Sequence, residues 1–281
     1  MESIEKANQL LTSFHELVNT KQAQAFNPED GYKVGVDLGT SSIVLVVLDG
    51  KNQPVFGAFE YANVIRDGLV VDYQQSVQIV NRLRIQAEEI LGFSLKAASG
   101  AIPPGTVGNN KRVVANVIES ANMLADQLVD EPTAAALVLG VTEGAVVDVG
   151  GGTTGISIFE QGQPIIVEDE PTGGTHMTLV IAGNNKISIE EAELLKRDPA
   201  RDRENFIICR PVIQRMANIT INVLRKHPTE PIYVVGGASY LSEFEKEFST
   251  YLKQEVYKPK YPQFVTPIGI AMSSKPIMDL M

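Results

Sequence analysis

A short pattern of residues occurs twice in this chain of 281 residues, and it restricts the fold more than any other feature of the sequence. Val36–Gly39 and Val147–Gly150 each combine apolar residues with one Asp and a final Gly. Each copy continues through a loop of small polar residues into a second apolar run, and a Gly-marked turn and a third run follow. The two aspartates, Asp37 and Asp148, are 111 positions apart. The repeat predicts an α/β chain with two related lobes, each beginning with three strands.

The composition fits a chain that buries a sizeable core, and it argues against several functions. Hydrophobic residues make up 44% and charged residues 21%, and the net charge is −10, so a broad basic face for nucleic acid is not expected. A single cysteine, Cys209, cannot form a disulfide within the chain, which fits a cytoplasmic location. The three histidines are far apart in the sequence and form no zinc-type spacing. Neither a secretory signal nor an apolar run long enough to span a membrane is predicted.

The first twenty residues read as an amphipathic helix that precedes the first repeat. Apolar residues recur at helical spacing over residues 2–20, and the polar stretch Lys21–Gly31, broken by Asn27-Pro28, reads as a linker. Such an apolar stripe either docks on the surface of the neighbouring domain or forms a detachable segment that binds a partner. The pattern alone leaves both interpretations open.

The two polar loops of the repeat have the chemistry of a phosphate site. Each follows an apolar strand, and each offers backbone N–H groups and hydroxyls with small side chains around them. Concave arrays of N–H groups bind phosphate oxygens. The aspartates at the strand ends would be repelled by phosphate, but they can hold Mg²⁺ through its water molecules, and the cation then meets the phosphates. Local N–H groups and Mg²⁺ would also attract the phosphates, which the negative net charge of the chain would otherwise repel.

Two other interpretations of the second loop remain. Gly150, Gly152 and Gly155 have the spacing of the dinucleotide-binding G-x-G-x-x-G motif, with Asp169 near the expected acidic position. That motif must open a helix, whereas Ile156–Phe159 alternates like a strand. The second alternative is a glycine-rich hairpin that binds no ligand.

Five motifs that follow one another along the chain resemble those of the DnaK-type chaperones. Val34–Ser42 (VGVDLGTSS) is similar to their first phosphate loop, and Val146–Glu160 (VVDVGGGTTGISIFE) to their second. Asp130–Ala136 (DEPTAAA) resembles the connecting motif before the hinge helix. Val234–Leu241 (VVGGASYL) resembles the adenosine motif, and Gly269–Ala271 the second connecting helix. Five motifs in the expected order are far more specific than any one of them.

The resemblance implies the actin-like ATPase fold, in which two ribonuclease-H-like βββαβα units surround a nucleotide cleft. It divides the chain into an N-terminal helix and linker (1–30), a first lobe (31–140, to which a C-terminal helix over 267–281 returns) and a second lobe (141–266). It implies ATP or ADP and Mg²⁺ as ligands. Within this class, the chain is most similar to a short, chaperone-like family of ethanolamine-utilisation proteins.

Carried over motif by motif, the resemblance also assigns roles to residues around the phosphates. Asp37 and Asp148 would hold hydrated Mg²⁺, and Glu131 would help to position the attacking water. Glu131, Asp148 and Thr153 form the predicted catalytic set. The predicted phosphate-binding residues come from the two loops, and they are Gly39, Thr40, Ser41, Ser42, Gly150, Gly151, Gly152 and Thr153.

A further set of residues is predicted to lie at the adenosine moiety. Gly236 and Gly237 would let it approach the backbone, with Ser239 nearby. Plainer interpretations exist for two of these assignments. Gly236 and Gly237 also suit a tight exit from a strand, and Glu131 also suits the first turn of a helix, where the dipole favours an acid.

The chain departs from DnaK-type domains at two places. These domains carry an inserted subdomain with a catalytic lysine, whereas the segment 51–72 is short here, and Lys51 and Arg66 are candidates only by their position in the sequence. The Lys/Glu pair of the adenosine helix has no clear counterpart in the predicted helix 205–226, where Arg210 and Arg215 are the candidate substitutes. No peptide-binding domain follows the second lobe within the 281 residues.

Three functions fit these observations. The first is a slow, Mg²⁺-dependent ATPase switch that acts, like a chaperone, on partner proteins; enzymes or shell proteins of an ethanolamine microcompartment are the candidate partners. The second is an adaptor that binds ATP without hydrolysing it and scaffolds an assembly. The third is a small-molecule kinase of the same fold, which would need a further carboxylate as a base beside an acceptor pocket.

Overall fold

Both copies of the repeat fold as three antiparallel strands in the computed structural model, which describes residues 2–66, 69–102 and 109–278. The first copy consists of β1 (Tyr32–Leu38), β2 (Ser42–Asp49) and β3 (Pro54–Tyr61). The second consists of β8 (Gly144–Val149), β9 (Thr154–Glu160) and β10 (Gln163–Glu170). The predicted turn after β2 is closed by Asp49, whose Oδ1 accepts from the N–H groups of Lys51 and Gln53, each at 2.8 Å.

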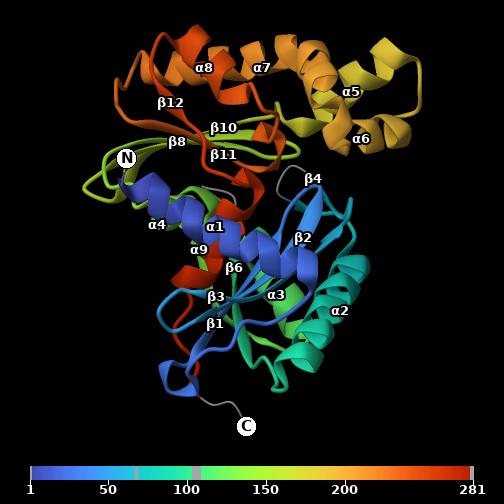
Figure 1. Ribbon diagram of the computed structural model, residues 1–281, viewed down its shortest axis with the longest axis vertical. Coiled ribbons are helices and arrows are strands. Elements are labelled where there is room, and N and C mark those ends of the chain that lie inside the picture. The colour runs from blue at the N-terminus through green and yellow to red at the C-terminus, as the bar shows by residue number, and fades with distance from the viewer. Residues whose placement is uncertain (1, 67–68, 103–108, 279–281) are drawn as a thin grey trace. The chain divides into compact units, whose positions relative to one another are not determined.

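Two parallel strands extend each set of three, and the strand order is the same in both sheets. Figure 1 shows the two sheets in the ribbon diagram. The first sheet has the order β3-β2-β1-β6-β7, with β6 at Ala97–Ile102 and β7 at Leu124–Asp130. The second has the order β10-β9-β8-β11-β12, with β11 at Ile232–Val235 and β12 at Val256–Tyr257. The strands β4 (Ile65–Arg66) and β5 (Leu69–Val70) form a small separate ribbon. The shared order confirms the predicted duplication.

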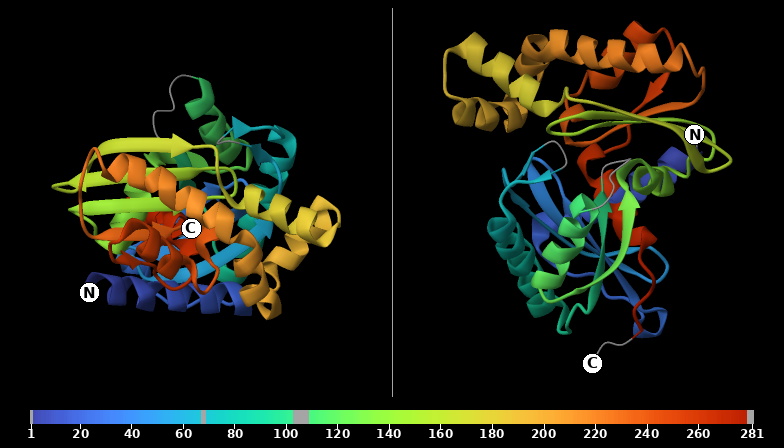
Figure 2. Two further views of the ribbon diagram at one scale, coloured as in Figure 1. Left: turned by 90° about the horizontal axis from the view of Figure 1, so that it is seen from above. Right: turned by 180° about the vertical axis from the view of Figure 1, so that it is seen from behind.

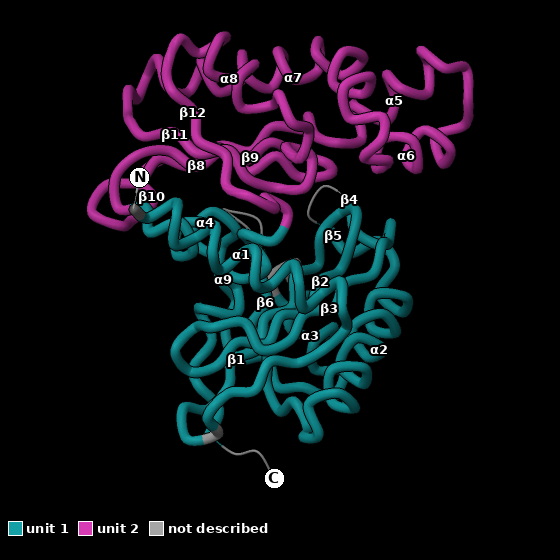
Figure 3. The backbone as a smooth tube through the Cα atoms, viewed as in Figure 1, with its two compact units in different colours: residues 1–141, 264–281 teal, residues 142–263 magenta. Residues whose placement is uncertain are grey.

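The chain divides into two units, which Figure 3 shows in different colours. Unit 1 comprises Met1–Val141 and Phe264–Met281, and unit 2 comprises Thr142–Gln263. The end of the chain is fastened to unit 1 by a pair of hydrogen bonds: Ile277 N donates to Tyr32 O at 2.8 Å, and Tyr32 N donates to Ile277 O at 3.0 Å.

Helices cover both faces of the sheet in unit 1. α2 (Tyr73–Leu91) and α3 (Asn109–Ser120) pack on one face and bury the apolar side chains of β1 and β2. On β1, β2 and β3, the residues Gly35, Val46 and Gly57 are opposite one another, so they share one face of the sheet. It is the face opposite to α2 and α3. α9 (Val265–Ser273) lies against Gly35 and crosses α4 (Glu131–Leu139). Small residues at these contacts allow the backbones to approach closely.

The N-terminal helix α1 (Glu2–Thr20) is docked on the same face of unit 1. Its apolar stripe, Ala7, Leu11, Phe14 and Val18, is buried. The ring of Phe14 lies over Gly57 of β3 and makes an edge-to-face contact with Phe264, with 5.1 Å between ring centroids. Ser3 Oγ donates to Leu139 O at 2.6 Å. Of the two interpretations of this helix, the structure therefore supports docking on the domain.

Unit 2 carries four helices among the described residues, α5 (Gly174–Asn185), α6 (Ile189–Arg197), α7 (Asp202–Leu224) and α8 (Phe244–Leu252). α7 and α8 lie over the sheet, as Figure 2 shows for α7 in orange above the strands, and they bury an apolar core with β8, β9 and β11. Ser188 caps α6, because its Oγ accepts from Glu191 N at 3.1 Å. Short 3₁₀ turns occur at Pro28–Asp30 (η1), Pro199–Arg201 (η2), Gly237–Ser239 (η3) and Pro262–Phe264 (η4).

The C-terminal helix is shorter than the predicted range 267–281. It begins at Val265 and ends at Ser273, and the backbone of Ser274 is extended. Pro276 follows soon after and disfavours helical geometry at Lys275, which explains the early end. Residues 279–281 of the predicted range lie outside the described residues. No helix in the described part of the chain has the length and the apolar character needed to cross a membrane.

Candidate functional site

In unit 1, the predicted site residues meet at one edge of the sheet because β1, β6 and β7 are parallel. Ile102 at the end of β6 is opposite Asp130 at the end of β7. Asp37 lies near the end of β1, the loop 39–41 follows that strand, and Glu131 follows β7. The carboxyl ends of parallel strands share an edge of the sheet, so both carboxylates belong to it. Asp37, Glu131 and the residues of the loop are half-buried.

The connecting motif of unit 1 begins a helix, as the plainer interpretation predicted. Asp130 is the N-cap of α4, and its Oδ1 accepts from Thr133 N at 3.0 Å. Pro132 occupies the first turn, where a missing N–H costs nothing. Asp130 therefore has a capping role, and Glu131 remains the half-buried carboxylate that a ligand at this edge could contact.

In unit 2, the second loop is held by the first residues of α5. Gly174 N donates to Gly150 O at 2.9 Å, and Thr175 donates to Gly151 O through both its N–H (2.8 Å) and its Oγ1 (2.9 Å). In a trans peptide, the N–H points away from the C=O of the same peptide group. Because the carbonyls of Gly150 and Gly151 face α5, the N–H groups of Gly151 and Gly152 are directed away from it. Two adjacent donors thus point to the same side, as phosphate binding requires.

The loop leads into a strand, which excludes the dinucleotide-binding interpretation. β9 begins at Thr154, and Gly155 pairs with Asp169 of β10 in an antiparallel ladder. Thr154 is buried, and its Oγ1 donates to Thr172 O at 2.6 Å, which ties the start of β9 to the segment before α5. No helix dipole follows the glycines, although the G-x-G-x-x-G motif needs one.

The predicted adenosine motif lies against Asp148. Val235 of β11 is paired with Asp148 of β8, and Gly236 follows with φ +88° and ψ 156°, a conformation essentially limited to glycine. A Cβ at Gly236 would lie 2.2 Å from Asp148 Oδ1. Ser239 is fully buried, and its Oγ donates to Gly236 O at 2.8 Å. The strand exit thus brings the Gly236-Gly237 backbone next to a predicted Mg²⁺ carboxylate, while the Ser239 hydroxyl is used within the turn.

Replacing Gly236 by alanine is expected to destabilise unit 2 by about 3 kcal/mol, because the new Cβ meets Asp148 and the backbone is strained. Gly162→Ala is the matched control, since Gly162 has φ +74° with nothing within 4 Å of an added Cβ. Its cost should be about 1 kcal/mol. Urea unfolding of the two variants checks the difference, and equal losses would show that the contact with Asp148 does not matter.

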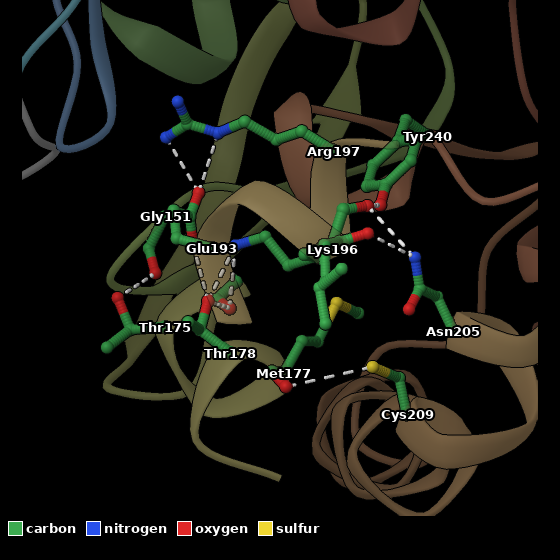
Figure 4. A network of polar contacts seen from close by, with 12 residues as sticks. Gly151, Thr175, Met177, Thr178, Glu193, Lys196, Arg197, Asn205, Cys209 and Tyr240 are labelled. Atoms are coloured by element: carbon green, nitrogen blue, oxygen red, sulfur yellow. Dashed lines mark hydrogen bonds and ion pairs between the residues drawn. The ribbon is translucent and has the colours of Figure 1, made fainter. Parts of the chain in front are cut away.

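The structure also shows a Lys/Glu pair on α6, outside the predicted helix 205–226. Glu193 and Lys196 lie on α6, one turn apart, and Lys196 Nζ donates to Glu193 Oε2 at 2.7 Å. Lys196 Nζ also donates to Gly174 O at 3.2 Å. Figure 4 shows Lys196 beside Glu193 and Thr178. The sequence signal that could have revealed this pair is a Glu and a Lys three residues apart, in the helix that follows the Ser188 cap.

Three residues were candidate substitutes: Arg210 and Arg215 for the Lys/Glu pair, and Lys51 for the catalytic lysine. The structure gives them the following positions and partners. Arg210 of α7 pairs with Glu247 of α8 at 3.0 Å, and Arg215 is exposed. Lys51 pairs with Asp30 at 2.7 Å. It follows Asp49, which is opposite Tyr32 at the start of β1, roughly 17 Å along the strand from Asp37. Lys51 is therefore at the wrong end of the sheet, and the side chain of Arg66 lies outside the described residues.

The isolated cysteine has a packing role. Cys209 is fully buried on α7, and its Sγ is 3.8 Å from Met177 O. Burial raises the pKa of its thiol to about 12, so the reactive thiolate is not available near neutral pH. Within the described ranges, no three His, Cys, Asp or Glu side chains come together as a metal-binding group.

The fold and the loops define the class of protein, namely the actin-like ATPase fold. The family model of the cell division protein FtsA matches residues 145–269, and that of the Hsp70 protein matches residues 65–176. MreB 5 of Spiroplasma citri, solved with AMPPNP, is similar with a TM-score of 0.69 at 17% identity, covering 87% of this chain and 96% of that one. At this identity the likeness shows the fold alone.

The chain belongs to the family of the ethanolamine utilization protein EutJ. It is 38% identical to EutJ of Salmonella typhimurium over 243 residues, which cover 86% of this chain and 85% of the relative. It is 37% identical to EutJ of Escherichia coli over 246 residues, which cover 86% of each. The crystal structure of EutJ from Carboxydothermus hydrogenoformans is similar with a TM-score of 0.92 at 48% identity, covering 96% of this chain and 98% of that one.

Proposed function

We propose that this protein binds ATP with Mg²⁺ and acts as a slow ATPase switch on partner proteins. The observation that carries the proposal is the second loop, where α5 holds the carbonyls of Gly150 and Gly151 and so turns two adjacent N–H groups to the other side. Such N–H pairs suit phosphate oxygens. The likeness to a structure solved with AMPPNP supports an adenine nucleotide as the ligand.

The residues present fit a hydrated Mg²⁺ ion. Mg²⁺ keeps several waters and takes one or two carboxylates together with substrate phosphates, so it needs no cluster of three protein ligands. Asp37 and Asp148, each at the end of the first strand of its unit, would supply those carboxylates. Bound there, the cation would neutralise phosphate charge as phosphoryl transfer to water proceeds.

Each remaining predicted residue then has a defined task. The N–H groups and hydroxyls of Gly39–Ser42 and Gly150–Thr153 would bind the phosphates. Glu131, half-buried at the edge of the sheet in unit 1, would orient the attacking water. Gly236 and Gly237 would let the nucleoside reach the backbone, and Ser239 would support this turn through its bond to Gly236 O.

The names of the relatives suggest where such a switch would act. The relatives are ethanolamine utilization proteins, so we propose that this protein acts in ethanolamine utilization. The single cysteine fits a cytoplasmic location for that role. The partners in this proposal are the enzymes or shell proteins of an ethanolamine microcompartment, which a chaperone-like protein would help to assemble.

One observation favours an ATP-binding adaptor as the second candidate. Lys51, a candidate for the catalytic lysine of DnaK-type domains, pairs with Asp30 at the end of β1 opposite to Asp37, so it does not serve the site in the described part of the chain. A site that grips ATP without completing hydrolysis would hold a partner for as long as the nucleotide stays bound.

A single-turnover experiment separates the two candidates. Protein in excess is loaded with γ-labelled ATP and Mg²⁺, and labelled phosphate is measured over hours. The switch predicts first-order release that stops when EDTA removes Mg²⁺. Bound ATP that survives intact for hours would replace the switch with the adaptor.

A further inference from the structure

The chain crosses from one unit to the other twice. The first crossing is the peptide bond between Val141 and Thr142, and the second is the one between Gln263 and Phe264. When two units rotate against each other, a few residues at the ends of elements absorb the change in backbone dihedral angles. The residues at the two crossings are therefore the ones that must adjust in any such movement of this chain.

The N-terminal end of α1 is fixed at the first crossing. Ser3 Oγ donates to Leu139 O at 2.6 Å, two residues before Val141. Gly140 ends α4 in the left-handed conformation, with φ +64°, and an added Cβ there would lie 3.7 Å from Ser3 Cβ. Val141 N donates to Ala136 O at 3.0 Å. Figure 3 shows α1 and α4 next to each other in unit 1. The last residues before the crossing are thus held by α4 and by α1.

The middle of α1 is fixed at the second crossing. Phe14 is fully buried, and its ring makes an edge-to-face contact with Phe264, the first residue after that crossing. The ring of Phe59 from β3 approaches Phe264 as well, with 6.3 Å between centroids. Gly57 leaves the space that the Phe14 ring fills. Phe264 is therefore anchored in a small aromatic cluster to which α1 contributes one ring.

The turn η4 extends this anchor toward the adenosine motif. It consists of Pro262–Phe264, so Phe264 belongs to unit 1 and Pro262 to unit 2. Gly236 N donates to Pro262 O at 3.0 Å, and Gly236 lies against Asp148. Phe14 and Gly236 thus contact the two ends of one short turn.

A helix transmits a displacement from one of its ends to the other. Ser3 and Phe14 are eleven positions apart in α1, which corresponds to roughly 16 Å along the helix axis. The buried apolar stripe of α1 holds the helix on unit 1 between these points. A movement at one crossing that shifts α1 therefore disturbs the contacts at the other crossing.

We propose that α1 is a brace that couples the two crossings, so that a hinge movement between the units requires α1 to shift on unit 1. The brace is a property of the nucleotide-free protein. Its consequence for the ligand, slower release of nucleotide while α1 is docked, rests on the proposed function.

The first test locks α1 at the first crossing and measures the effect at the second. Ser3→Cys with Gly140→Cys places two thiols at a Cβ separation of 3.7 Å, which suits a disulfide. The native cysteine, Cys209, is fully buried on α7. The oxidised and reduced forms share one sequence, so each is the control for the other. In nucleotide-free, ¹⁵N-labelled protein, oxidation should slow hydrogen exchange of the Gly236 amide about tenfold, because that N–H bonds to Pro262 O on η4.

Two results of this test would overturn the brace. Failure of the disulfide to form under mild oxidation would show that α1 is not docked at Gly140. A disulfide that forms but leaves exchange at Gly236 unchanged would show that the two crossings are independent.

The second test loosens α1 at the second crossing and measures the effect at the first. Phe14→Leu removes the ring that contacts Phe264, and it should speed exchange of the Val141 amide about tenfold. Phe56→Leu is the matched control, since Phe56 is equally buried and precedes Gly57 in β3, where it joins the core on the opposite face of the sheet. This control should leave the Val141 amide unchanged. Equal acceleration in both variants would reduce the effect to a general loss of stability in unit 1 and would contradict the brace.

The consequence for the nucleotide is measured separately. In the presence of Mg²⁺, a fluorescent ADP should dissociate about tenfold more slowly from the oxidised double-cysteine variant than from its reduced form, because release requires the hinge to move. Equal dissociation rates would contradict this consequence. If neither form bound the nucleotide, the proposed function would fail, and the exchange rates of Gly236 and Val141 would still decide whether α1 couples the crossings.

Discussion

Replacing Asp148 by asparagine is expected to lower Mg²⁺-dependent ATP hydrolysis at least about 100-fold, and replacement by alanine is expected to abolish it. The asparagine side chain keeps the shape that Gly236 packs against, but it lacks the charge that holds the hydrated cation. Phosphate release at saturating ATP and over a range of Mg²⁺ concentrations measures the effect. The loss should shrink at high Mg²⁺ if the carboxylate acts mainly on affinity for the cation.

Asp169→Asn is the matched control for this prediction. Asp169 is an exposed aspartate in the same sheet, and it is the acid that the dinucleotide-binding interpretation would use. Its replacement should leave hydrolysis unchanged. Undiminished turnover in Asp148→Asn, with a melting temperature equal to that of wild type, would remove Asp148 from the site.

Gly269→Ala is expected to destabilise unit 1 by about 3 kcal/mol. The added Cβ would lie 1.8 Å from Ala134 O and 2.3 Å from its carbonyl carbon, so α9 and α4 would have to move apart. α9 also packs on β1, which carries Asp37, and the variant should therefore weaken nucleotide binding as well.

Gly183→Ala gives the opposite expectation at a comparable helical position. Gly183 lies in α5, and an added Cβ there would meet nothing within 4 Å. Alanine favours the helix by about 1 kcal/mol over glycine, so this variant should be more stable than wild type. Urea denaturation, fitted without assuming a single transition for two units, compares the pair. A stable Gly269→Ala protein would mean that α4 and α9 do not cross closely.

The fold was predictable from the sequence because its signals are local. An apolar strand, a small polar loop and a Gly-marked turn recur around Asp37 and Asp148, and each feature depends on residues that are neighbours in the chain. The start of α4 at Asp130 and the start of α6 at Ser188 are local as well, since a cap binds an N–H three residues further on.

What the sequence could not show depends on contacts between distant residues. Thr175 holds Gly151, which is 24 positions earlier, and Lys196 reaches Gly174 across 22 positions. The docking of α1 depends on Phe14 and Gly57. Gly57 lies inside a strand, and only the structure shows that the ring of Phe14 occupies the space a side chain at Gly57 would need. Periodicity marks an apolar face, but it does not say which surface covers that face.

The most direct measurement is a calorimetric titration of the purified wild-type protein with ATP and with ADP, each with Mg²⁺ and with EDTA. The account predicts saturable binding at one site for both nucleotides, tighter with Mg²⁺ than with EDTA, because the cation joins the Asp148 carboxylate to the phosphates. Absence of binding heat for both nucleotides in the presence of Mg²⁺, confirmed by an unchanged melting temperature at millimolar nucleotide, would contradict it.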